Sequence, residues 1–150
     1  MESQKFSELG ERERERYNEG LERKGYEKIF NHCRYFYIRR RYSLIKEMMQ
    51  YVQGKKVLEI GSTAWRGWLE KNSILPSSLT CINISEAELQ AGIDSAVDSN
   101  NSPNFLLMDA HDLQFEDETF DFVYGDAILH HLNMVPALDE IFRVLKPNGK

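Results

Sequence analysis

Lys56–Gly67, KVLEIGSTAWRG, decides the fold of this chain. Its aliphatic residues form a short run that stops at Gly61, as a buried parallel strand does before a turn. Glu59 interrupts the run one residue before the strand would end. Because a buried strand rarely keeps an unpaired carboxylate, the pattern predicts that Glu59 and the backbone around Gly61 face a polar ligand. A carboxylate that only stabilises a turn would give the same pattern.

The amino-acid composition narrows the classes of protein to which this chain can belong. The 150 residues are 41% hydrophobic, which is enough for one globular domain with a core. A net charge of -5 argues against nucleic acid as a partner, because phosphate binding needs a clustered positive surface. Cys33 and Cys81 have neither disulfide nor zinc spacing, so we expect a reducing, cytoplasmic setting and no metal. No run approaches the ~20 apolar residues of a membrane span, so no membrane partner is expected.

Helical and strand patterns alternate along the chain. Apolar residues at helical spacing predict a helix over about 35–52. Ser85 and Glu88 fit a capping box at the start of a second helix that runs to about 97. Pro136 suits the first turn of a third helix, in which Leu138, Ile141, Phe142 and Leu145 share a face.

Strand patterns cover residues 56–60, 79–84, 104–108 and 120–124. Their alternation with helices predicts an α/β fold of the Rossmann-like, doubly wound type, with a mostly parallel sheet. Polar residues sit at each predicted strand end: Glu59 to Gly61, then Asn83, Asp109, and Gly125 with Asp126. Because parallel strands end at one edge, these residues are expected to form one site.

Two common phosphate-binding motifs are absent. A dinucleotide fingerprint needs GxGxxG after the first strand, where this chain has Gly61-Ser62-Thr63-Ala64-Trp65-Arg66. A Walker loop fails as well, because five residues separate Gly61 from Gly67 and no lysine follows.

Four blocks of the sequence resemble the class I S-adenosylmethionine-dependent methyltransferase family, in particular its small-molecule branch. The blocks are VLEIG, LTCINISEAEL, FLLMDAHDLQFEDETFDFVYGDAILHHL and ALDEIFRVLKPNGK, and they span about Lys56–Lys150. The resemblance implies S-adenosyl-L-methionine as the cofactor and a small-molecule methyl acceptor. It implies a cofactor site formed by Glu59, Gly61, Ser62, Asn83, Ile84, Asp109, Ala110, Gly125 and Asp126.

Within that implied site, Glu59 and Gly61 line the methionine end, Asp109 and Ala110 hold the adenine, and Gly125 with Asp126 passes beside the methionine moiety. The chain departs from the family in two places. Thr63 and Trp65 stand where further glycines are usual, and Asn83 replaces the acid that binds the ribose hydroxyls. A carboxylate forms stronger charge-assisted hydrogen bonds, so Asn83→Asp is expected to raise cofactor affinity.

Histidines supply the candidate catalytic group. His130 follows the fourth strand, and an imidazole there could take a proton from a hydroxyl, since its ordinary pKa lies near ~6.5. His131 is expected to pack in a helix or to order a loop. His111 is expected to be a surface or turn residue.

Two segments are expected: an N-terminal helical lid over 1–54, with Tyr17 or Tyr26 as a substrate contact, and an α/β domain over 55–150. The family sheet has three more strands, so the chain is expected either to be a fragment that lacks them or to have, at its fourth strand, an open edge that a partner chain or a second copy covers. The predicted activity is methyl transfer to oxygen or nitrogen of a small molecule. The alternative is a methyltransferase-like binding module without catalysis.

Overall fold

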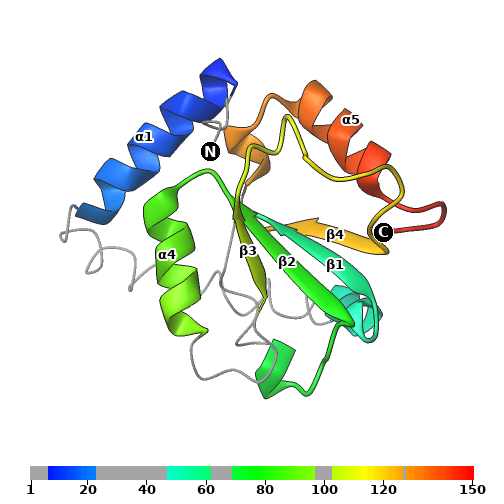
Figure 1. Ribbon diagram of the computed structural model, residues 1–150. Coiled ribbons are helices and arrows are strands. Elements are labelled where there is room, and N and C mark those ends of the chain that lie inside the picture. Colours follow the sequence, from blue (N-terminus) through cyan, green and yellow to red (C-terminus); the bar gives the residue numbers. More distant parts are fainter. Residues whose placement is uncertain (1–6, 23–46, 62–68, 97–102, 127) are drawn as a thin grey trace.

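A computed structural model describes residues 7–22, 47–61, 69–96, 103–126 and 128–150 of the chain. Its helices and strands follow one another as in Figure 1. The helical elements are α1 (Glu8–Glu22), the 3-10 turn η1 (Gln50–Val52), α4 (Glu86–Ser95), the 3-10 turn η2 (Leu129–His131) and α5 (Met134–Val144). The strands are β1 (Lys56–Ile60), β2 (Ser78–Asn83), β3 (Asn104–Leu107) and β4 (Phe122–Gly125).

The four strands form one parallel sheet in the order β3-β2-β1-β4. This confirms the predicted α/β fold and leaves β4 at an edge of the sheet. The strand expected over 120–124 begins two residues later, because Phe120 forms only an isolated bridge with Leu145. Most of the helix expected over 35–52 lies outside the described residues, and the part that is described ends in η1.

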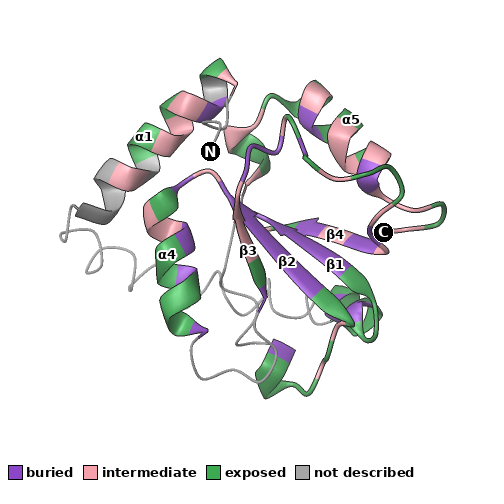
Figure 2. Ribbon diagram, in the orientation of Figure 1, coloured by how far each residue is buried: buried purple, intermediate pink, exposed green. Residues whose placement is uncertain are grey.

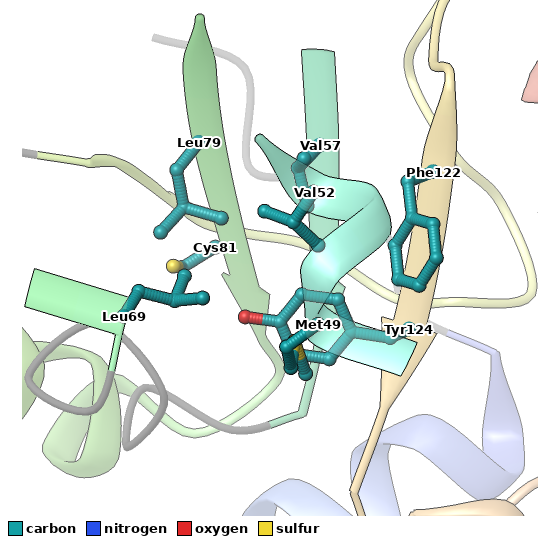
Figure 3. Close-up of a cluster of buried hydrophobic side chains, with 8 residues drawn as sticks. All are labelled: Met49, Val52, Val57, Leu69, Leu79, Cys81, Phe122 and Tyr124. Carbon is teal, nitrogen blue, oxygen red and sulfur yellow. The ribbon is translucent and has the colours of Figure 1, made fainter. Parts of the chain in front are cut away.

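Apolar side chains cover both faces of the sheet, and β1 is nearly all buried (Figure 2). Because successive strand residues point to opposite faces, Val57 faces one layer while Leu58 and Ile60 face the other. The first layer is completed by Met49, Val52, Leu69, Leu79, Cys81, Phe122 and Tyr124 (Figure 3). The second contains Ile82, Met108, Ala110, Leu113, Phe120 and Val144.

Helix α5 packs on this second layer with a face that matches the expected one only at Ile141. Ala137 and Val144 are buried, whereas Leu138 and Phe142 are 44% and 83% exposed. The amphipathic pattern therefore located the helix and one of its packed residues, Ile141, but not its fully buried residues. Among the described residues, no helix is long and apolar enough to cross a membrane.

Helix α4 begins as half of the expected capping box. Ser85 is its N-cap, and the Ser85 Oγ accepts a hydrogen bond from the Glu88 N–H at 3.3 Å. The reciprocal bond is not formed, because the Ser85 N–H donates to Asn83 Oδ1 at 2.8 Å instead. The Glu88 carboxylate is thereby left for another partner.

Candidate functional site

The carboxyl ends of the strands surround a cavity under α1. Five residues of the predicted site line it, and they come from the ends of three neighbouring strands: Gly61, Asn83, Ile84, Asp109 and Ala110. The sequence also indicated that strand ends would meet here, since parallel strands end at one edge. The lining includes four further polar residues that were not assigned to the site: Glu13, Glu88, His111 and His131.

Four predicted site residues do not line this cavity. Glu59, Gly125, Asp126 and His130 are absent from its described lining. Ser62 lies outside the described residues, as do Thr63, Trp65 and Tyr26. Gly125 still contributes indirectly, because a Cβ there would lie 2.6 Å from Cγ2 of Ile128, which lines the cavity.

Glu59 is fully buried on the opposite face of the sheet from Ile60. Its Oε2 accepts hydrogen bonds from the Tyr124 hydroxyl at 2.9 Å and from Cys81 Sγ at 3.5 Å. Burial raises the pKa of Tyr124, and the Glu59 charge raises it further, so the phenol stays a proton donor. The strand alternation explains why Glu59 faces this layer and not the cavity.

Asp109 is the most constrained acid of the cavity. Its Oδ2 accepts from the Ser7 backbone N–H at 2.9 Å and from the Ser7 Oγ at 2.6 Å. Its Oδ1 accepts from the His111 backbone N–H at 3.0 Å. Burial alone would raise the pKa of Asp109, but the hydrogen bonds from Ser7 and His111 lower it overall, so the group is a carboxylate at neutral pH.

His111 lies in the turn after β3, which is one of the two expected places, but its side chain is not on the surface. Its side chain is 7% exposed, and its Nδ1 lies 2.6 Å from Asp109 Oδ1. Its Nε2 accepts from the Asn133 backbone N–H at 2.9 Å, so the ring proton is on Nδ1 and is donated to Asp109. His111 therefore links Asp109, just after β3, to Asn133 at the start of α5 through two hydrogen bonds.

The two adjacent histidines have different surroundings. His131 lines the cavity, and its Nδ1 lies 3.0 Å from Glu13 Oε2, at ion-pair distance but without hydrogen-bond alignment. His130 is exposed, and its ring lies against that of His131, with 3.7 Å between centroids. Burial, together with the nearby His130 and Arg16, lowers the pKa of His131 overall although Glu13 raises it, so His131 is neutral at pH 7.

Helix α1 forms the roof of the site and lies beside α4 (Figure 1). Ser7 caps it, since the Ser7 Oγ accepts from the Gly10 N–H at 3.0 Å. Arg14 pairs with Glu86 at 2.5 Å, and the Ser85 Oγ donates to Asn18 Oδ1 at 2.6 Å. The roof is thus attached to both β3 and α4. The side chain of Tyr17, expected as a substrate contact, is outside the described set.

Comparison with known proteins identifies a family and several proteins to which this chain is similar. The family model described as a methyltransferase domain matches residues 58–150. Demethylmenaquinone methyltransferase from Staphylococcus carnosus (strain TM300) is 33% identical over 110 residues, which are 70% of this chain and 44% of that protein. Sterol 24-C-methyltransferase erg6 from Schizosaccharomyces pombe is 31% identical over 99 residues, which are 64% of this chain and 26% of that protein.

The chain therefore spans less than half the length of these two curated relatives. Among solved structures, an S-adenosylmethionine dependent methyltransferase from Mesorhizobium loti aligns with a TM-score of 0.60 at 17% identity. That alignment covers 72% of this chain and 50% of the other, and at such low identity it supports the fold alone.

Proposed function

The chain belongs to the methyltransferase domain family, and we propose that it transfers a methyl group from S-adenosylmethionine to an oxygen or nitrogen of a small molecule. The observation that carries the proposal is the acid-lined cavity at the carboxyl ends of the strands. Ligands of open α/β sheets bind at this edge. The type of acceptor atom, oxygen or nitrogen, is part of the proposal, because the relatives differ: one of them is named a sterol 24-C-methyltransferase.

The acidic side chains among the described residues of the cavity suit the positive charge of this cofactor. Glu13, Glu88 and Asp109 all line it, and carboxylates suit both the hydrogen-bond donors of adenosine and the positive charge of a sulfonium. When bound, S-adenosylmethionine supplies an electrophilic methyl group. Asp109 and Ala110 would hold the adenine, and Gly61 would lie along the methionine end.

His131, and not His130, is the proposed general base. It lines the cavity, whereas His130 does not, and its lowered pKa keeps the imidazole neutral and able to accept a proton. The proton released by an acceptor hydroxyl would pass to the His131 imidazole, and Glu13 would stabilise the resulting charge. Methyl transfer otherwise needs mainly positioning and exclusion of water, which α1 would provide as a lid.

The position of β4 at the edge of the described sheet supports the proposal that a partner chain or a second copy completes the sheet. Lys150 already pairs there, donating its N–H to the Asp121 carbonyl at 3.2 Å and accepting from the Val123 N–H at 2.8 Å. The edge therefore accepts a parallel segment. The exposed apolar residues of α5 add a surface of the kind found at interfaces.

Calorimetric titration of the full chain with S-adenosylmethionine and with S-adenosylhomocysteine tests the proposed cofactor. We expect saturable binding of both ligands with a stoichiometry of one. Absence of binding at millimolar ligand by a folded protein would contradict the proposal. Binding without methyl transfer to any acceptor would instead favour the non-catalytic module.

A further inference from the structure

Asn83 stands where the family has its ribose-binding acid, but its side-chain nitrogen and oxygen both already have hydrogen-bond partners. Asn83 Nδ2 donates to the Gly61 carbonyl at 3.2 Å and to Glu88 Oε2 at 2.9 Å, while Oδ1 accepts from the Ser85 N–H. An amide has two donor hydrogens, and both are engaged. Turning the amide over would place its oxygen against the Glu88 carboxylate, so these partners fix its orientation.

Glu88 is the carboxylate that this arrangement presents to the cavity. It lies five positions after Asn83 in the first turn of α4, and it lines the same cavity as Asp109 and Ala110. The Glu88 carboxylate does not accept a hydrogen bond from the Ser85 N–H at the start of α4, because that N–H donates to Asn83 Oδ1. The side chain is half-buried, and one of its oxygens is bound by the Asn83 amide.

We propose that Glu88 accepts the hydrogen bonds of the ribose hydroxyls, and that Asn83 is a positioning residue that holds it there. This inference rests on the proposed function, since it assigns a residue within the same cofactor site. In this assignment, the acid that binds the ribose lies in the first turn of α4, whereas the family usually has it at the end of the second strand. The amide at the strand end and the acid on the helix act as one unit.

The arrangement reverses the expectation for Asn83→Asp. An aspartate there would bring a second carboxylate to about the 2.9 Å that now separates Asn83 Nδ2 from Glu88 Oε2, and it would lose the donor to the Gly61 carbonyl. Like charges at such a distance repel. We therefore expect Asn83→Asp to weaken cofactor binding, which is the opposite of the gain that the sequence alone suggested.

The test titrates the full chain with S-adenosylhomocysteine and with its 2′,3′-dideoxy counterpart. Glu88→Gln keeps an oxygen for Asn83 but removes the charge, and we expect it to bind S-adenosylhomocysteine about tenfold more weakly than the parent. It should bind the dideoxy ligand as the parent does. Asp94→Asn, the same change at the far end of α4, should leave both affinities unchanged, since Asp94 is exposed and bonded to Gln90.

An exchange variant tests the role of Asn83. Asn83→Asp should lose affinity, and adding Glu88→Gln should leave it about tenfold or more below the parent, because the carboxylate that is proposed to bind the ribose is then missing from α4. Recovery of the parent's affinity in the double variant would show that the acid works from position 83 and would overturn the assignment to Glu88. Equal binding of S-adenosylhomocysteine by Glu88→Gln and the parent would overturn the inference and leave the proposed function standing. No binding by the folded parent would overturn both. Thermal melting of each variant separates lost affinity from lost fold.

Discussion

At the scale of single residues, the two histidines after β4 differ in what they can do. A base must be neutral to accept a proton, and the pKa of His131 lies below its ordinary 6.5 because burial disfavours the charged ring. The rate of methyl transfer is therefore expected to be the same at pH 6.5 as at neutral pH. It should decline only at lower pH, where the His131 imidazole becomes protonated.

We expect His131→Gln to slow transfer by about 10²–10⁴-fold, which is the usual contribution of a general base, with little change in cofactor affinity. Initial rates with labelled S-adenosylmethionine and a panel of hydroxyl and amine acceptors, measured across pH, check both points. If His130→Gln abolishes transfer while His131→Gln does not, the base is His130 and the geometric argument fails.

The sequence indicated which strand ends meet, but not every side chain that faces the cavity. Gly61, Asn83 and Asp109 could be found because each lies at or just after the end of a strand of regular pattern. Glu88 was missed because its direction depends on a competition between Asn83 and Glu88 for the Ser85 N–H. His111 was missed because its partner Asn133 is 22 residues away, and no local pattern shows such a contact.

At the scale of elements, the position of α1 depends on a glycine. A Cβ added to Gly10 would overlap Asp109 Oδ2 and would lie 2.7 Å from Ile84 Cδ1. The cavity beneath α1 measures about 40 Å³. Typical ligand pockets hold roughly 300–1,000 Å³, so we infer that α1 moves outward when a cofactor enters.

Gly10→Ala is expected to displace α1 from the site without weakening the helix itself, because alanine favours helices by about 1 kcal/mol over glycine. Hydrogen exchange followed by mass spectrometry should show faster exchange in α1, with the sheet unchanged. Arg12→Ala is the matched control, since Arg12 is an exposed residue of the same helix. Slower or unchanged exchange in Gly10→Ala would mean that the close packing at Gly10 does not hold the roof in place.

At the scale of the whole molecule, the sheet has an edge at β4, and α5 exposes a set of apolar side chains. Val135 is 70% exposed and Phe142 83%, and Met134 and Leu138 lie on the same helix with over two-fifths of their surface exposed. Exposed apolar groups of this size favour association.

Sedimentation velocity should show a mass that rises with protein concentration. Phe142→Glu should reduce this association and leave the melting temperature within a few degrees, because a residue so exposed contributes little to the core. A parent protein that stays monomeric at all concentrations would exclude a second copy at this surface.

The overall architecture was the most predictable feature, since alternating strand and helix patterns allow few arrangements. The order β3-β2-β1-β4 confirms that reasoning. The choice of buried residues on α5 was not predictable, because Leu138 and Phe142 fit an amphipathic stripe as well as Ala137 and Val144 do. Only the packing of the helix on the sheet decides between them.

The central claim is that S-adenosylmethionine binds at the carboxyl ends of the strands, under α1. A crystal structure of the full chain with S-adenosylhomocysteine tests it most directly. We predict the adenine beside Asp109 and Ala110, the ribose hydroxyls within hydrogen-bond distance of the Glu88 carboxylate, and α1 moved away from Asp109. A ligand bound elsewhere on the chain, or a ribose that contacts neither Glu88 nor its neighbours in the cavity, would contradict the account.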